Sequence, residues 1–183
     1  MNSTSIESDS AVTRREFLKT STSALAGATL LGTLPLQRNV HAVGSDLLKI
    51  ALVGCGGRGS GAADQALKAA GNAKLVAMAD VLPEKLEKGL ASLREQHPAQ
   101  VQVPPDCQFT DFDGYKKATS LADVVILATS PGFRPMHFAE AVRQGKHVFM
   151  EKPVATDAPG IRQLLAAAEE AKKKNLKVGV GFQ

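Results

Sequence analysis

From residue 47 onward, short apolar runs alternate along the chain with longer stretches that mix apolar and charged positions. An apolar run without a polar face is typical of a strand buried on both sides of a sheet. Such runs predict strands at residues 47–53, 74–79, 107–110, 123–128, 147–150 and 177–182. The mixed stretches predict helices at residues 60–70, 84–96, 112–118, 134–144 and 159–174. A proline-punctuated stretch, residues 98–105, is expected to be a loop.

This order of strands and helices indicates the fold class. Parallel strands need long crossover connections, and helices of the predicted lengths supply them. Right-handed crossovers of this kind predict an α/β fold with a doubly wound parallel sheet. With 183 residues, 44% of them hydrophobic and 22% charged, the chain has the composition of a globular protein with one domain's core.

A glycine-rich loop, VGCGGRGSG, follows the first predicted strand and precedes the first predicted helix. It places Gly54, Gly56 and Gly59 in the pattern GxGxxG, which in this context indicates a dinucleotide site. The first glycine allows the tight turn, the second lets a pyrophosphate approach, and the third lets helix and strand pack. The helix N-terminus then presents N–H groups to the phosphates. FAD and S-adenosylmethionine sites use similar loops, which the loop alone does not exclude.

Asp80 directly follows the second predicted strand, about 20 residues after the loop, where a carboxylate accepts hydrogen bonds from an adenosine ribose. Because a carboxylate repels a 2′-phosphate, the sequence favours NAD over NADP. Arg58 weakens that preference, since a guanidinium in the loop can pair with the extra phosphate. The alternative role for Asp80 is that of a helix-capping or turn residue.

Two further loops follow the strands at 123–128 and 147–150: Thr129-Ser130-Pro131 and Glu151-Lys152-Pro153. In a doubly wound sheet, loops at the carboxyl ends of the strands line the ligand crevice. Lys152 is suited to donate a hydrogen bond to a substrate oxygen and to stabilise charge that develops there during hydride transfer. The alternative is a plain surface turn. The Lys152–Pro153 bond is a candidate for the cis form found at some tight-turn prolines.

The stretches KIALVGCGGRG, LVAMAD, DVVILATSP and GKHVFMEKPVATD together resemble the Gfo/Idh/MocA family of oxidoreductases, in the right order over residues 47–183. The resemblance implies an N-terminal Rossmann domain that binds NAD or NADP. It also implies a larger C-terminal α/β domain that carries the substrate pocket and through which relatives usually form homo-oligomers. The chain ends where relatives continue into that domain, so we expect a fragment that binds a dinucleotide but does not turn over a substrate.

Motif and resemblance together predict a set of cofactor-binding residues: Gly54, Gly56, Arg58, Gly59, Asp80, Thr129, Pro131, Glu151 and Lys152. Within this set, the resemblance places Thr129 and Pro131 beside the nicotinamide. It directs Glu151 and Lys152 toward the nicotinamide ribose and the substrate, with Lys152 as the catalytic residue. His137 is the candidate counterpart of a polar residue found in relatives, although a packing or capping role is the alternative.

Three functions fit these residues. The leading one is an NAD-dependent oxidoreductase that moves hydride to or from a sugar, cyclitol or sugar derivative. A second is an NAD-dependent glycosidase, which oxidises a sugar transiently, eliminates the aglycone and restores the cofactor. A third is a non-catalytic dinucleotide-binding module. A metal site, a disulfide framework and nucleic-acid binding are not expected, because Cys55 and Cys107 lack ligand spacing and no aromatic stripe is present.

The chain begins differently. Residues 13–19, TRREFLK, match the twin-arginine export pattern, and an uncharged run of Ala, Gly, Ser, Thr and Leu follows. The run is too short and too polar to span a membrane, so no stable anchor is expected. We predict a signal peptide over residues 1–42, cleaved after Ala42, ahead of a Rossmann domain over residues 43–183. The partner would be the twin-arginine translocase and the destination the periplasm; an amphipathic N-terminal helix is the alternative.

Overall fold

The computed structural model describes residues 47–181, and every structural statement here concerns this part of the chain. The predicted export signal, residues 1–42, lies outside the described residues. Phe182, near the end of the last predicted strand, lies outside them as well.

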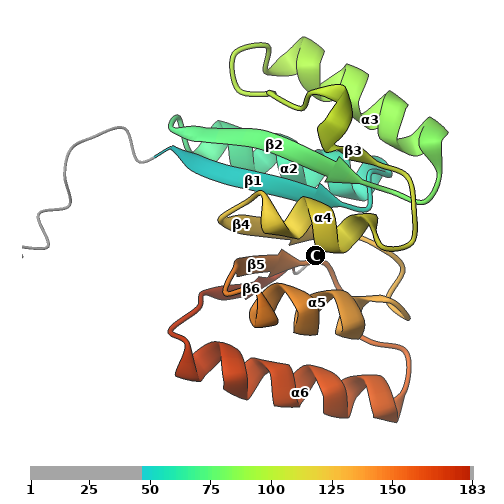
Figure 1. The fold of residues 1–183 in the computed structure, drawn as a ribbon, viewed down its shortest axis with the longest axis vertical. Coiled ribbons are helices and arrows are strands. Elements are labelled where there is room, and N and C mark those ends of the chain that lie inside the picture. Colours follow the sequence, from blue (N-terminus) through green and yellow to red (C-terminus); the bar gives the residue numbers. More distant parts are fainter. Residues whose placement is uncertain (1–46, 182–183) are drawn as a thin grey trace, which may run out of the picture. The chain divides into compact units, whose positions relative to one another are not determined.

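Strands and helices alternate along the described chain (Figure 1). The strands are β1 (Leu48–Val53), β2 (Ala73–Ala79), β3 (Gln108–Phe109), β4 (Val124–Leu127), β5 (His147–Met150) and β6 (Val178–Val180). The helices are α2 (Gly57–Ala69), α3 (Pro83–Gln96), α4 (Gly114–Ser120), α5 (Arg134–Arg143) and α6 (Ala158–Lys173). A 3₁₀ turn, η1 (Pro105–Cys107), precedes β3.

The described strands form one parallel sheet in the order β3-β2-β1-β4-β5-β6. The first three strands are therefore added outward from β1 on one side, and the next three, beginning with β4, are added on the other side of β1. This reversal opens a crevice at the carboxyl ends of β1 and β4, which is where doubly wound sheets bind ligands. The predicted fold class, an α/β doubly wound parallel sheet, is confirmed.

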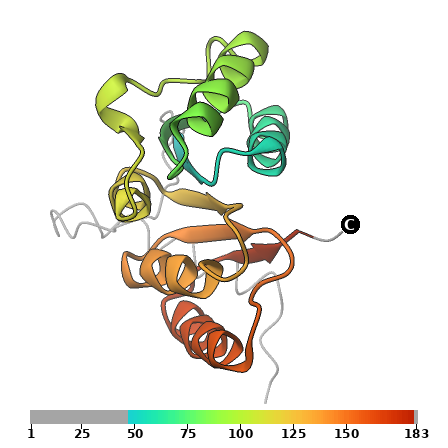
Figure 2. The ribbon, with the colours of Figure 1, turned by 90° about the vertical axis from the view of Figure 1, so that its right-hand side faces the viewer.

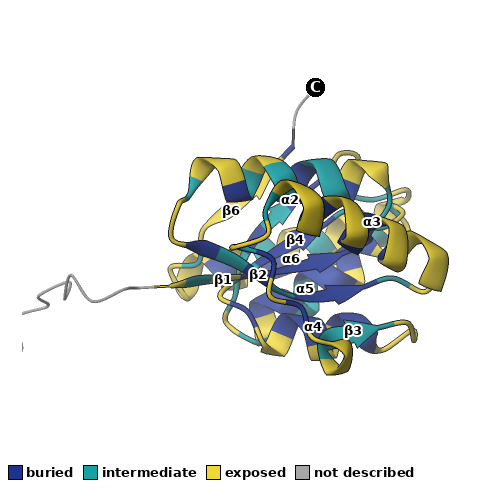
Figure 3. Cartoon of the chain, turned by 90° about the horizontal axis from the view of Figure 1, so that it is seen from above, coloured by how far each residue is buried: buried dark blue, intermediate teal, exposed yellow. Residues whose placement is uncertain are grey.

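Each face of the sheet has its own hydrophobic core, because successive side chains of a strand point to opposite faces. In β1, Ala51 and Val53 pack into the core shared with α4, α5 and α6. Ile50 and Leu52 pack into the core shared with α2 and α3. Figure 2 shows the two groups of helices around the sheet, and Figure 3 shows buried strands between helices whose outer surfaces are exposed. Burial on both faces explains why β1, β2 and β4 read as continuous apolar runs, whereas all three residues of β6, at the edge of the sheet, are exposed.

Two helices begin two or more residues away from their predicted starts, whereas α3 and α6 each begin one residue early. α2 begins at Gly57 rather than near residue 60, since the Gly56 carbonyl already accepts a helical hydrogen bond from the Ser60 N–H, at 2.9 Å. The glycine loop therefore continues into the first turn of the helix. α4 begins at Gly114 rather than at residue 112, because Asp111 holds a turn by accepting the Asp113 N–H at 2.9 Å.

The prediction that residues 98–105 form only a loop is wrong at one point. Val101 forms an isolated parallel bridge with Leu75 of β2, and both side chains are buried. The Gln102 N–H donates to the Leu75 carbonyl at 2.8 Å. The flanking prolines mask this extension in the sequence, because proline removes ladder hydrogen bonds and usually marks a loop.

Candidate functional site

Two glycines of the loop are required by the fold itself. Gly54 has a φ of +93°, and a Cβ at this position would lie 2.6 Å from the Ala128 carbonyl carbon of the neighbouring strand's end. A Cβ on Gly59 would lie 1.9 Å from the Gly54 carbonyl oxygen. Both distances are far below ordinary contact, so the tight turn and the close packing of α2 need residues without side chains.

Gly56 and Gly57 are different, because a Cβ at either position would meet nothing within 4 Å. Both lie at the N-terminus of α2, where the first N–H groups have no partner within the helix. Among residues 47–181, the space in front of this helix end is therefore open. The open helix end has room for a ligand that contacts backbone N–H groups, such as a pyrophosphate.

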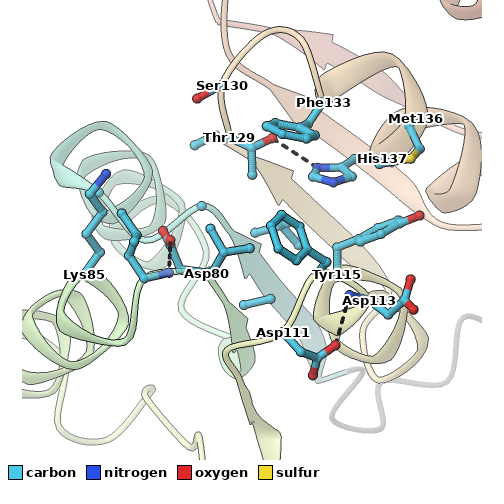
Figure 4. A pocket seen from close by; sticks show the side chains of 18 of the residues that line it. Asp80, Lys85, Asp111, Asp113, Tyr115, Thr129, Ser130, Phe133, Met136 and His137 are labelled. Atoms are coloured by element: carbon cyan, nitrogen blue, oxygen red, sulfur yellow. Dashed lines mark hydrogen bonds between the residues drawn. The ribbon is translucent and has the colours of Figure 1, made fainter.

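Asp80 joins the end of β2 to the glycine loop. Its Oδ2 accepts the Cys55 N–H at 2.7 Å, and its Oδ1 accepts the Leu82 N–H at 3.0 Å. The side chain thus has the turn-forming role considered above, while the carboxylate remains half-buried at the edge of a pocket (Figure 4). Each carboxylate oxygen accepts more than one hydrogen bond, so these contacts leave capacity for ribose hydroxyls.

Cys55, the second residue of the loop, is buried. Burial, together with the charge of Asp80, raises the pKa of its thiol far above the usual range. A protonated, buried thiol is a poor nucleophile and a poor metal ligand, so Cys55 acts as a small packing residue. Within residues 47–181 no group of three or more metal-ligating side chains occurs, and no helix there is long and apolar enough to cross a membrane.

A pocket of about 590 Å³ lies at the carboxyl ends of β1, β2 and β4. Asp80 and Lys85 line one side of it, and Thr129, Phe133 and His137 line another (Figure 4). Its wall combines the glycine backbone with apolar and aromatic side chains, as in most cofactor sites. Other lining residues include Gly54, Gly56, Val81, Leu82, Phe112, Tyr115 and Met136.

Thr129 and His137 share a hydrogen bond at this pocket, with 3.1 Å between the threonine Oγ1 and the histidine Nδ1. The imidazole is buried, and its ring centroid lies 4.2 Å from that of Tyr115. Burial, followed by the nearby charge of Arg134, lowers the pKa of His137 from 6.5 to about 4. The ring is therefore neutral at pH 7. His137 therefore packs against Tyr115 and orients Thr129, and it does not act as a cationic group.

Glu151 and Lys152 occupy contrasting positions after β5. The Glu151 side chain is 3% exposed, and its Oε1 lies 2.7 Å from Arg58 Nη2. Lys152 is exposed and does not line the pocket, and the Lys152–Pro153 bond is cis, as considered from the sequence. The Arg58 guanidinium thus contacts the β5 side of the site, whereas Asp80 lies at the end of β2, on the other side of β1.

The structure places the predicted residues in three groups. Gly54, Gly56, Asp80 and Thr129 line the pocket. Gly59 lies beneath the glycine loop. The remaining predicted residues lie outside the pocket wall: Arg58, Pro131, Glu151 and Lys152.

Sequence reasoning missed Arg134, which it treated as the plain start of a helix. This side chain is buried, and its Nη1 donates to the carbonyls of Glu151 and Pro153 while its Nη2 donates to that of Thr129. An arginine at a helix start is usually exposed, so nothing in the local pattern marks it. It also missed the aromatic wall of Tyr115 and Phe133, because aromatic residues predict core as readily as a ligand site.

A parallel sheet of this strand order, with a glycine loop after β1 and an acid after β2, defines a dinucleotide-binding Rossmann domain. The chain belongs to the Gfo/Idh/MocA family, described as an oxidoreductase family with an NAD-binding Rossmann fold, whose model matches residues 48–182. The resemblance noted in the sequence is thereby confirmed. No sequence among the curated proteins matches the chain.

Solved structures show the same fold. One is scyllo-inositol dehydrogenase from Lactobacillus casei with bound NAD(H) and scyllo-inositol: 29% identity, TM-score 0.56, covering 73% of this chain and 36% of that one. Another is the WlbA dehydrogenase from Bordetella pertussis with NADH and UDP-GlcNAcA: 27% identity, TM-score 0.56, covering 73% of this chain and 34% of that one. The chain thus spans about a third of the length of these enzymes.

Proposed function

We propose that this chain is the NAD-binding part of a dehydrogenase that moves hydride to or from a hydroxyl-bearing carbon of a sugar, cyclitol or sugar derivative. The family supports the oxidoreductase class. The substrate class is supported by similar enzymes whose structures contain scyllo-inositol or a UDP-linked sugar acid.

The observation that carries cofactor binding is the open space at Gly56 and Gly57, beside a pocket of about 590 Å³. At Gly54 and Gly59 a Cβ would collide with neighbouring backbone atoms, whereas at Gly56 and Gly57 it would meet nothing within 4 Å. The latter two glycines leave the helix N-terminus accessible, which fits a pyrophosphate held by backbone N–H groups.

The positions of the charged residues support NAD over NADP. Asp80 is suited to accept hydrogen bonds from the adenosine ribose, and its charge opposes a 2′-phosphate. Arg58, the residue that could favour that phosphate, pairs instead with Glu151 on the β5 side of the site. NAD recognition therefore rests on Asp80, with Gly54 and Gly56 at the phosphates and Thr129 toward the nicotinamide end.

A bound nicotinamide supplies the hydride acceptor or donor. The chain's own contribution is the exposed Lys152, whose ammonium would donate a hydrogen bond to the reacting oxygen of the substrate and favour negative charge there. The neutral His137 would keep Thr129 oriented at the pocket wall.

Export and assembly complete the proposal. The match of residues 13–19 to the twin-arginine pattern supports delivery to the periplasm by the twin-arginine translocase, which carries folded proteins. An exported enzyme has no supply of free NAD, so it would leave the cytoplasm with the cofactor tightly bound. Assembly into a homo-oligomer is proposed as well, on the resemblance to the family alone.

The test of cofactor binding is a fluorescence titration of the purified chain with NADH and with NADPH. We expect NADH to bind more tightly, and we expect Asp80→Asn to reduce this preference by about tenfold, since one charge-assisted contact is worth about 1.5 kcal/mol. Asp106→Asn, an exposed acid on η1 outside the pocket, is the matched control and should leave both affinities unchanged. Absence of binding to either nucleotide would overturn the proposal.

A further inference from the structure

Three charged or polar side chains are buried together at the carboxyl ends of β4 and β5: Arg134, His137 and Glu151. His137 hydrogen-bonds Thr129, and Glu151 pairs with Arg58, as described above. Arg134 does not line the pocket and is not explained by cofactor contact. Since burying a guanidinium is costly unless it is well hydrogen-bonded, its position calls for a specific function.

The contacts of Arg134 connect two loops. Its Nη2 donates to the Thr129 carbonyl, in the loop after β4. Its Nη1 donates to the carbonyls of Glu151 and Pro153, in the loop after β5. These last two residues flank Lys152, so one nitrogen holds the main chain on both sides of the proposed catalytic lysine. Lysine could not replace these contacts, because its ammonium is a point charge rather than a planar fork.

The Glu151 side chain extends this connection to the glycine loop. Its carboxylate pairs with Arg58 in the first turn of α2, while its carbonyl is held by Arg134. The loops after β1, β4 and β5 are thereby joined through two arginines that approach Glu151 from different elements. Asp80 accepts the Cys55 N–H of the loop after β1 and the Leu82 N–H beside it, and within residues 47–181 neither hydrogen bond reaches the loops after β4 and β5.

From this geometry we infer that Arg134 is a positioning residue for the nicotinamide half of the site: it sets the Thr129 loop and the Lys152 loop relative to each other. This inference rests on the proposed NAD binding. It separates the site into an adenosine half, organised by Asp80 and the glycine loop, and a nicotinamide half, organised by Arg134. Loss of Arg134 therefore has unequal effects on the two ends of the cofactor.

The test compares two ligands on the full 183-residue chain. ADP-ribose, measured by calorimetry, reports on the adenosine half, and NADH, measured by its fluorescence, reports on both halves. For Arg134→Met we expect about a tenfold loss of NADH affinity, the equivalent of one or two neutral hydrogen bonds, and a weaker emission enhancement of bound NADH. We expect ADP-ribose affinity to stay within about twofold of the wild type.

Two further variants control for folding. Arg134→Lys retains the charge without the fork and should show the same selective loss, even if Arg134→Met does not fold. Arg94→Met removes another arginine that donates to a backbone carbonyl, that of Val103, and should change neither affinity. Equal losses for both ligands, or an unchanged NADH affinity, would overturn the positioning role. A wild-type chain that bound neither ligand would instead overturn the proposed function on which it depends.

Discussion

Arg58 and Glu151, 93 residues apart, form an ion pair with 2.7 Å between Nη2 and Oε1. The arginine side chain is 41% exposed, whereas the glutamate side chain is 3% exposed. The two partners therefore differ in what their loss would leave behind. Without Glu151 the arginine can turn to solvent, but without Arg58 a buried carboxylate loses its cationic partner.

We predict that this asymmetry is measurable in urea unfolding. Arg58→Met should lower the free energy of unfolding by about 1–3 kcal/mol, since it leaves a buried charge without that partner. Glu151→Gln should lower it less, and the double variant Arg58→Met/Glu151→Gln should be more stable than Arg58→Met alone. Lys68→Met, which removes an exposed partner of Asp64, is the control and should have a smaller effect than Arg58→Met. Equal losses for the two single variants would contradict the prediction.

The glycine loop allows a paired test of which glycines the fold requires. Gly59→Ala should lower the free energy of unfolding by about 3 kcal/mol, because its Cβ would lie 1.9 Å from the Gly54 carbonyl oxygen. Gly57→Ala, in the same helical turn with nothing within 4 Å, should be neutral or stabilising by about 0.5 kcal/mol. Denaturant unfolding of both variants provides the measurement. If Gly57→Ala lowered the free energy of unfolding, the position would not be open as described.

The lowered pKa of His137 predicts a pH dependence of stability. The folded protein keeps the ring neutral down to about pH 4, whereas the unfolded chain protonates it below about pH 6.5. The free energy of unfolding should therefore fall as the pH is lowered from 6.5 to 4, by about 3 kcal/mol from this residue. Other groups titrate in the same range, so the measurement is the difference between wild type and His137→Gln. Parallel stability curves for the two proteins would refute the prediction.

The export prediction concerns residues outside the described part of the chain. Replacement of both arginines, Arg14→Lys and Arg15→Lys, should keep the protein in the cytoplasm, because the twin-arginine translocase reads the arginine pair. Cell fractionation followed by immunoblotting measures this, with Arg38→Lys, an arginine of the predicted signal peptide outside residues 13–19, as the matched control. If the variant were still exported with its cofactor bound, the proposal that cofactor-loaded protein leaves through the twin-arginine translocase would be wrong.

The order of the elements and the glycine loop could be read from the chain because their causes are local. Buried parallel strands need continuous apolar runs, and a tight strand-to-helix turn needs glycine, so Gly54 and Asp80 are recognisable from sequence spacing. Boundaries were less predictable where side chains compete with the helix, as at Asp111 before α4. The bridge between Val101 and Leu75 was missed because its prolines mark a loop while its partner lies in another strand.

The sequence by itself determined the strand and helix order, the doubly wound fold class, the family and the position of the glycine loop. Only the tertiary structure decided the partners of Arg58 and Arg134. Sequence alone could not identify these partners because they lie on separate elements of the chain. Arg58 contacts a carboxylate 93 residues away, and Arg134 contacts carbonyls on two different loops. Such contacts exist only once β1, β4 and β5 lie side by side, and no local spacing encodes them.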